Sequence, residues 1–269
     1  MPETMDPFAQ FKQVQKESWK HFGRMETLTT ASAARLVQFA GVAKAMRVLD
    51  VACGTGVVAV TAARLGAKVK GADLTPQLLE QARENSRTAE VEVEWVETDV
   101  ENLPFPDGEF EIVLSQFGHM FAPRPEVAIA EMLRVLRPGG TIAFSTWPPE
   151  SQSGRSMALG GRYLPPPPAG AASPTLWGDP NIVRERLGDA VEEIVFGRHH
   201  LSTPALSPQH FRLDRERSVG PMIKMVEALS ATNPGRLEEF RREYDALVAQ
   251  YLSDNLVRQD YLLTRARKR

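Results

Sequence analysis

The sequence has one cysteine, no long apolar run and no excess of charge of either sign. The single Cys53 excludes an internal disulfide and a zinc site built from several cysteines, and we expect no metal site. No apolar run reaches the length of a membrane span, and the N-terminus lacks an apolar signal region, so we expect a cytoplasmic protein without a membrane span. A formal net charge of −2 gives no general attraction to nucleic acid phosphates, so no nucleic acid partner is expected.

Strand and helix patterns alternate through the first half of the chain. This alternation predicts an α/β fold with a doubly wound, Rossmann-like sheet of seven mostly parallel strands, the last of them antiparallel. The expected strands lie near 47–52, 68–73, 92–98, 110–116 and 140–146, and the expected helices near 57–65, 76–87 and 125–136.

The N-terminal segment is expected to be helical. Asp6 and Pro7 are typical of a helix start, and the apolar residues that follow predict a helix to about residue 22. We interpret this helix as a lid over a ligand site, although simple docking of an amphipathic helix on the sheet would give the same pattern. A second helix is expected over 30–39. The mostly apolar face of the first helix consists of Phe8, Phe11, Gln15, Trp19 and Phe22.

The order of elements changes after Trp147. Prolines and glycines over 148–180 predict a long loop, and residues 207–253 read as a helical insert in two or three pieces. Two further strands, near 192–200 and 260–267, are expected to form an antiparallel hairpin. Arginines of the insert interleave with glutamates, so we expect an ion-paired surface rather than a site for an anionic substrate. These arginines are Arg212, Arg215, Arg217, Arg241 and Arg242.

The turn after the first strand carries the strongest sequence signal. Asp50 lies in an apolar run, and a turn of small residues from Ala52 to Gly56 leads into a helix. Such a turn brings bare backbone close to a ligand at the carboxyl end of a parallel strand. Residues 54–59 also satisfy the dinucleotide fingerprint, which leaves a nicotinamide-dependent oxidoreductase open. However, a pyrophosphate needs the helix N-terminus, whereas a carboxylate at Asp50 suits a cationic ligand.

Two further aspartates end the next two predicted strands. Asp73 follows Asp50 by 23 residues, and a carboxylate there accepts ribose hydroxyls in either class of nucleotide ligand. Asp99 precedes the apolar stretch Leu103-Pro104-Phe105, which suits one wall of an adenine pocket. Each aspartate alone is compatible with an ordinary cap or turn. Three in succession favour a nucleotide site.

The stretch 48–56, together with 98–110 and 131–140, resembles class I S-adenosylmethionine-dependent methyltransferases. Residues 103–110 are similar to the subgroup that contains ubiquinone and menaquinone C-methyltransferases and many small-molecule methyltransferases. The resemblance implies S-adenosylmethionine as cofactor, a small-molecule methyl acceptor and in-line transfer. It implies a helical lid over 1–44, a cofactor-binding core over 45–147, and a remainder over 148–269 that belongs with the core.

The same resemblance implies roles for individual residues. Asp50, Gly54 and Gly56 would line the methionine half of the cofactor, Asp73 would hold the ribose, and Asp99 with Val100 would face the adenine. Ala52 departs from the glycine of many relatives by one methyl group. The full set of cofactor-binding residues so implied is Trp19, Asp50, Ala52, Cys53, Gly54, Gly56, Asp73, Leu74, Asp99, Val100, Gln116 and Phe117.

Two reactive side chains have alternative interpretations. Cys53 is interpreted as a small apolar residue whose backbone faces the cofactor, because nothing nearby in the sequence would lower the pKa of its thiol. His119 is the candidate for proton removal from the acceptor, with a structural, hydrogen-bonding histidine as the alternative. For the whole chain, three hypotheses stand: a small-molecule methyltransferase, which is preferred, an NAD(P)-dependent oxidoreductase, and a non-catalytic nucleotide-binding regulatory protein.

Overall fold

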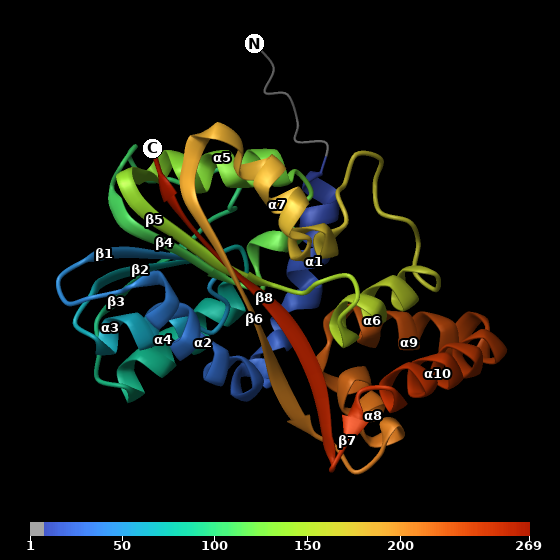
Figure 1. Ribbon diagram of the computed structural model, residues 1–269. Helices are drawn as coiled ribbons and strands as arrows, with labels where there is room; N and C mark the ends of the chain where they lie inside the picture. The colour runs from blue at the N-terminus through green and yellow to red at the C-terminus, as the bar shows by residue number, and fades with distance from the viewer. Residues whose placement is uncertain (1–7) are drawn as a thin grey trace.

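The computed structural model describes residues 8–269, and the predicted helix start at Asp6 and Pro7 lies outside them. One sheet organises the fold (Figure 1). Its strands are β1 (Arg47–Val51), β2 (Lys68–Asp73), β3 (Val93–Glu97), β4 (Phe110–Gln116), β5 (Leu136–Thr146), β6 (Val191–Pro204), β7 (Leu252–Ser253) and β8 (Leu256–Lys268).

The strand order is β3-β2-β1-β4-β5-β8-β6, with the short β7 paired to β8. The pairs from β3 to β5 are all parallel, so the carboxyl ends of β1 to β4 meet at one edge of the sheet. β8 is antiparallel to both β5 and β6, which confirms the expected terminal hairpin. The prediction of a mostly parallel, Rossmann-like sheet is therefore correct.

Helices cover both faces of the sheet. On one side α2, α3 and α4 pack against the strands, and on the other α5 and α7 pack together over β5 and β6 (Figure 1). The helices are α1 (Ala9–Trp19), α2 (Glu26–Ala40), α3 (Val57–Arg64), α4 (Pro76–Thr88), α5 (Pro125–Val135), α6 (Gln152–Gly161), α7 (Pro180–Leu187), α8 (Pro208–Ser218), α9 (Gly220–Thr232) and α10 (Pro234–Ala249), with 3-10 turns at Lys20–Met25, His119–Phe121, Pro174–Gly178 and Gly188–Ala190.

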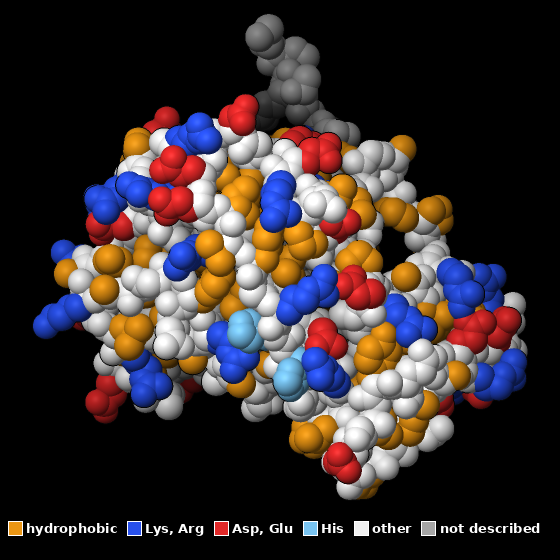
Figure 2. Space-filling view, in the orientation of Figure 1, with side chains coloured by type: hydrophobic (Ala, Val, Ile, Leu, Met, Phe, Trp, Pro, Cys, Tyr) orange, Lys and Arg blue, Asp and Glu red, His pale blue; other side chains and the backbone are white. Residues whose placement is uncertain are grey.

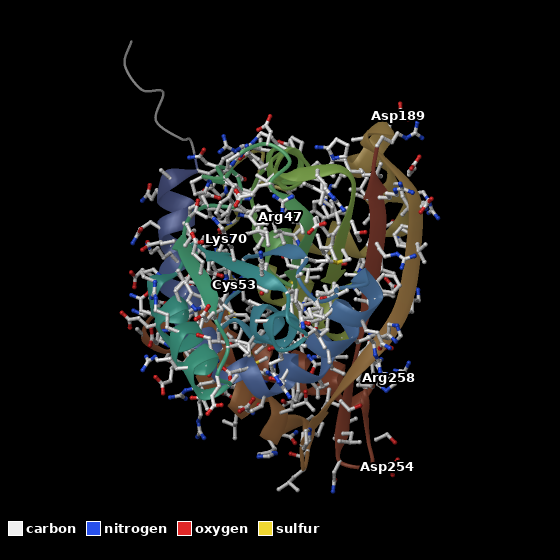
Figure 3. The ribbon with its side chains drawn as sticks, turned by 90° about the vertical axis from the view of Figure 1, so that its left-hand side faces the viewer. Arg47, Cys53, Lys70, Asp189, Asp254 and Arg258 are labelled. Atoms are coloured by element: carbon white, nitrogen blue, oxygen red, sulfur yellow. The ribbon has the colours of Figure 1, made fainter. Side chains whose placement is uncertain are left out.

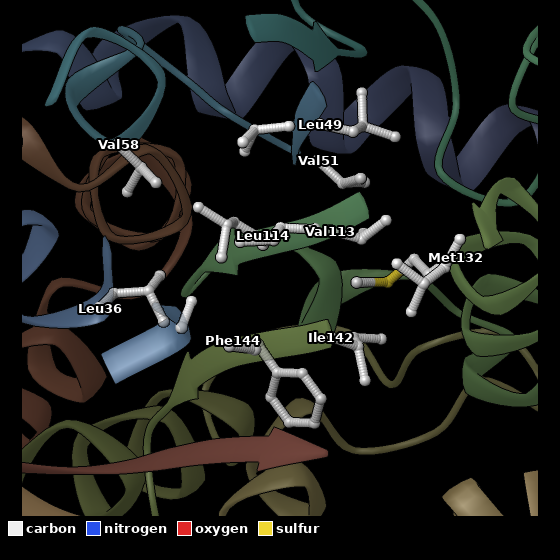
Figure 4. Packing of buried hydrophobic residues seen from close by; sticks show 14 of the residues in the cluster. Leu36, Leu49, Val51, Val58, Val113, Leu114, Met132, Ile142 and Phe144 are labelled. Atoms are coloured by element: carbon white, nitrogen blue, oxygen red, sulfur yellow. The ribbon is translucent and has the colours of Figure 1, made fainter. Parts of the chain in front are cut away.

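The main core lies between the sheet and these helices. Leu49 and Leu114 from the central strands are fully buried, and Leu36 of α2 and Met132 of α5 close the two faces (Figure 4). Strands buried on both faces read as continuous apolar runs, which is why β1 and β4 were recognisable from the sequence. Within residues 8–269, no helix combines the length and apolar character that a membrane crossing requires.

The β6–β8 hairpin is much longer than the other strand pairs. Figure 3 shows it edge-on, running the height of the molecule from Asp189 to the turn at Asp254. Its far end extends past the sheet and meets the helical insert α8–α10 (Figure 1). The insert and α6 enclose a second apolar cluster of their own, which includes Phe211, Phe240 and Val248.

Three expected boundaries were wrong. The loop expected over 148–180 contains α6, whose start is capped by the Ser151 hydroxyl accepting from the Gly154 amide at 3.0 Å. The turn expected at 138–140 lies inside β5. Phe110 of β4 pairs with Leu136 and Ile112 pairs with Thr141, so the residues of β5 between these two pairs form a bulge. The second helix starts at Glu26 rather than residue 30.

Candidate cofactor-binding site

The turn between β1 and α3 has an unusual backbone. Ala52, Gly54 and Gly56 all have positive φ, at 51°, 55° and 78°. A Cβ on Gly56 would lie 2.3 Å from the Trp95 ring, whereas a Cβ on Gly54 would meet nothing within 4 Å. Gly56 is therefore required for packing, and Gly54 keeps open space beside the turn.

Asp50 closes the N-terminus of α3. Its Oδ2 accepts a hydrogen bond of 3.0 Å from the amide of Ala59, in the first turn of that helix. This bond uses one amide in the first turn of α3 and places a carboxylate beside it, which disfavours a pyrophosphate there. Its Oδ1 is buried and has no hydrogen-bond partner within the described part of the chain. Burial raises the pKa of Asp50 well above its usual value, so a nearby cation would stabilise the ionised form.

Asp73 ties the ends of β1 and β2 together. Its Oδ2 accepts from the Gly54 amide and its Oδ1 from the Thr75 amide, both at 2.8 Å. Burial raises its pKa, and these two amides oppose that rise. The carboxylate is therefore fixed in orientation, with lone pairs left to accept from a ligand.

Asp99 follows β3 and faces the N-terminal helix. Lys12 of α1 lies 2.7 Å from its Oδ2 and 2.6 Å from Oε2 of Glu101. Glu101 is buried and also accepts from Arg124. Gln15 donates to the Phe121 carbonyl at 3.2 Å. These contacts hold α1 across the carboxyl edge of the sheet.

The loop after β4 lies against the turn after β1. Phe117 has a φ of 57°, uncommon for an aromatic residue, and its amide donates to the Ser145 carbonyl at 3.0 Å. A Cβ on Gly118 would lie 2.5 Å from the Ala52 side chain, so these loops touch. Gln116 donates to the Thr29 carbonyl at 3.0 Å, while its buried Oε1 has no partner among residues 8–269. Backbone conformations of this kind concentrate at ligand sites.

Together these loops line the first cavity, with about 1070 Å³ of space that is partly open to solvent. It contains every residue expected to bind cofactor except Gly56, which packs beneath the turn. The sequence did not single out Met25, Glu26 and Thr29, because Met25 ends a 3-10 turn and α2 starts at Glu26, whereas the second helix was expected to start near residue 30. The expected residues present are Trp19, Asp50, Ala52, Cys53, Gly54, Asp73, Leu74, Asp99, Val100, Gln116 and Phe117.

Cys53 lies inside the molecule beside the strand ends (Figure 3). Burial raises the pKa of its thiol well above the usual value, with Asp50 and Asp73 adding to the rise. A neutral, buried thiol is a poor nucleophile, in keeping with a small apolar residue at this position.

His119 does not line the cavity, against its expected role as a proton acceptor. The side chain is fully buried between Phe144 and Trp177, at 4.6 and 4.8 Å between ring centroids. Neither ring nitrogen has a hydrogen-bond partner within residues 8–269. Burial, with Arg186 nearby, lowers its pKa to about 3. His119 is thus a neutral packing residue, and the hydrogen-bonding alternative is not seen either.

A second cavity adjoins the first and encloses about 1670 Å³ of partly open space. Its walls come from the N-terminal helices, α6 and the insert, and most of its lining is apolar, including Met222, Met225 and Phe240. Residues that line both cavities are Trp19, Phe22, Met25, Thr29, Phe117 and Phe121.

Comparison with known proteins agrees with this geometry. A family model described as a methyltransferase domain matches residues 49–144, the part that contains the three aspartates. The chain belongs to the class I S-adenosylmethionine-dependent methyltransferases. Its cofactor is therefore S-adenosylmethionine, and no comparison supports the oxidoreductase alternative.

Known proteins resemble this methyltransferase over different shares of their length. A protein of Mycobacterium tuberculosis described only as uncharacterised is 37% identical over 234 residues, covering 87% of this chain and 85% of that protein. The demethylmenaquinone methyltransferase of Thermus thermophilus is 41% identical over 105 residues, only 38% of this chain and 48% of that enzyme. A methyltransferase candidate from Bacillus halodurans shares the fold, with a TM-score of 0.61 and 23% identity, over 88% of this chain and 99% of that one.

Proposed function

We propose that this methyltransferase binds S-adenosylmethionine in the first cavity and methylates a small, mostly apolar molecule in the second. The observation that carries the proposal is the shared wall, because methyl transfer requires donor and acceptor to meet in line. Phe117 and Trp19 line both cavities, so a ligand in either cavity would contact them.

The first cavity fits the charge pattern of the cofactor. S-adenosylmethionine supplies a methyl group activated by a positive sulfur, and it also carries an ammonium. The buried Oδ1 of Asp50 and Oε1 of Gln116 are acceptors without partners in residues 8–269, and such atoms suit cationic N–H donors. In this proposal Asp73 accepts the ribose hydroxyls, and Asp99 with Val100 faces the adenine.

In this proposal the protein accelerates methyl transfer mainly by aligning the cofactor with the acceptor and by excluding water from the site. Aligning two bound partners supplies a large part of the rate, provided that the reacting atoms lie close together. Trp19 and Phe22 of the N-terminal segment line the shared region, so this segment acts as the lid. Lys12 holds it to Asp99 and Glu101, directly beside the cofactor site.

The acceptor side has no side chain poised as a general base, because burial raises the pKa of Tyr244, the one tyrosine among the described residues that line it. Among the described residues that line the second cavity there is no carboxylate, histidine, lysine or cysteine. We infer that the acceptor presents a nucleophile that is already deprotonated or that loses its proton to water. The Thermus enzyme does not define the acceptor, because this chain matches less than half of that enzyme.

Calorimetry combined with a turnover assay tests the proposal. We expect S-adenosylhomocysteine to bind one site per chain and NADH not to bind, because the carboxylate of Asp50 beside the start of α3 disfavours a pyrophosphate. We then expect S-adenosylhomocysteine release with members of a panel of quinols, phenols, amines and thiols. Firm cofactor binding without turnover of any acceptor would favour the non-catalytic alternative, and binding of NADH alone would contradict the proposal.

A further inference from the structure

One arginine of the helical insert departs from the expected ion-paired surface. Arg215 of α8 is 5% exposed and lines the second cavity. Its guanidinium carbon lies 4.5 Å from the Phe211 ring centroid. One terminal nitrogen contacts the sulfur of Met25, and the other lies 3.5 Å from the Thr203 hydroxyl. These contacts place a positive charge against an apolar cavity.

The charge of Arg215 is poorly compensated. Among residues 8–269, the only carboxylate within 4.0 Å is that of Asp214, 3.8 Å from Nε, and the Asp214 side chain is 61% exposed. Nε itself is buried and has no hydrogen-bond partner in that range. Burial accordingly lowers the pKa of Arg215. Buried arginines are normally paired, so this one lacks a partner that a ligand would supply.

Neighbouring arginines of the insert are satisfied within the protein. Arg212 pairs with Glu216 and Asp245 at 2.7 and 2.8 Å. Arg241 also pairs with Glu216, at 2.9 Å. Glu216 directly follows Arg215 on α8, so its carboxylate is already engaged by two other arginines. Figure 2 shows blue and red side chains close together over the insert, in agreement with such pairing. The expectation of ion pairs thus holds for Arg212 and Arg241. Arg217 and Arg242 are exposed, and Arg215 is buried without a close carboxylate among the described residues.

The other polar groups around the cavity satisfy one another. Gln152 donates to the Ser156 hydroxyl at 2.9 Å. Gln259 donates to Ser153 at 3.1 Å and accepts from Thr203 at 2.6 Å. Among the described residues that line this space, Arg215 is the one charged side chain, and its terminal nitrogens meet only weak acceptors, the Met25 sulfur and the Thr203 hydroxyl.

We propose that Arg215 binds a carboxylate of the methyl acceptor, which makes the acceptor an apolar molecule with one acidic end. The proposal rests on the function proposed above and names its substrate class. Met25 contacts Arg215 and lines both cavities, so an acid held there would extend toward the cofactor site. The planar guanidinium matches a carboxylate through two parallel hydrogen bonds.

Matched probes and variants test this proposal. The probes are benzoate, cinnamate and 2-naphthoate, each compared with its uncharged carboxamide, and titrated into protein saturated with S-adenosylhomocysteine. We expect the best acid to bind at least about tenfold more tightly than its amide, as for a hydrogen-bonded charged group. Arg215→Gln should abolish this preference. Arg217→Gln, an exposed position on the same helix, should keep it.

A second variant guards against loss of folding. Arg215→Lys keeps the charge but not the planar fork, and should retain a reduced acid preference with an unchanged affinity for S-adenosylhomocysteine. Equal binding of acids and amides, no binding of either, or a full preference in Arg215→Gln would overturn the role of Arg215. These outcomes would leave methyl transfer intact. Failure of the wild-type protein to bind S-adenosylhomocysteine would instead overturn the function proposed above, and this inference with it.

Discussion

The ring of Phe117 stacks on the ring of Trp147, with centroids 3.9 Å apart and planes 6° apart. Tyr261 packs edge-on against both rings and fixes the pair from the sheet side. Phe117 lines both cavities, whereas Trp147 lines only the second. The stacked pair therefore connects the proposed donor site to the proposed acceptor site.

Trp147→Leu should separate cofactor binding from turnover. Loss of the stacking partner enlarges the acceptor cavity, so we expect kcat/KM for an identified acceptor to fall about 10- to 100-fold through misalignment. The affinity for S-adenosylhomocysteine, measured by calorimetry, should remain the same. By contrast, Phe117→Leu should weaken both. If Trp147→Leu weakened cofactor binding as strongly as turnover, the two cavities would not have separate roles.

Asp73→Asn should weaken cofactor binding. The substitution replaces one acceptor oxygen by an NH2 group that faces the Gly54 or Thr75 N–H, so it leaves one of these donors without its partner. We expect a loss of about 1–3 kcal/mol in the binding free energy of S-adenosylhomocysteine. Calorimetry on variant protein with a normal circular dichroism spectrum measures this loss, and an unchanged affinity would remove Asp73 from the ribose role.

Lys12→Met should loosen the lid. The substitution leaves Asp99 and the buried Glu101 without this cation, although Arg124 still pairs with Glu101. We expect faster amide hydrogen exchange over α1 and faster dissociation of S-adenosylhomocysteine, with a cost of roughly 1–3 kcal/mol to docking of the helix.

A lysine on the neighbouring turn gives the matched control for the lid. Among the described residues, Lys20 pairs only with Glu17, at 2.9 Å. Both side chains are well exposed. Lys20→Met should therefore change neither hydrogen exchange over α1 nor cofactor dissociation. Equal effects of the two lysine variants would contradict the role of Lys12.

His119 should make the fold sensitive to acid. Its pKa is lowered to about 3 in the folded protein, whereas an unfolded histidine takes up a proton near its usual value of 6.5. Above pH 6.5 both states are neutral, and below it only the unfolded state gains the proton. Stability is therefore lost as the pH falls from 6.5 toward 3, by about 2 kcal/mol between pH 6.5 and 5.

His119→Phe should remove this part of the acid sensitivity. Urea unfolding at pH 8, 6.5 and 5 compares the free energies of unfolding of the two proteins. We expect the wild type to lose more stability than the variant over the lower interval, and the variant to keep methyl transfer. A variant that folds but loses all turnover would restore His119 to the reaction.

The sequence predicted the cofactor half of the fold well because its signals are local. Asp50, Gly54 and Gly56 lie within one turn, and both their chemistry and their backbone requirements follow from residue type. The parallel strands are buried on both faces, so each appears as a short apolar run. Strand order then brings Asp73 and Asp99 to the same edge as Asp50.

The remaining site features depend on contacts that no local pattern contains. Arg212 and Arg215 lie three residues apart among the same acidic neighbours. Arg212 is ion-paired, whereas Arg215 faces a cavity. The Arg212–Glu216 pair has i,i+4 spacing within α8, but the pairs Arg212–Asp245 and Arg241–Glu216 depend on the packing of α8 against α10. His119 similarly follows β4 in the sequence like a site residue, but its side chain turns away from the cavity toward Trp177.

A crystal structure of the S-adenosylhomocysteine complex tests the central claim most directly. The account predicts ribose hydroxyls within hydrogen-bond distance of Asp73, the adenine beside Val100 and the sulfur facing Phe117 and the second cavity. Density for the ligand elsewhere, or with its sulfur closed off from that cavity, would contradict it.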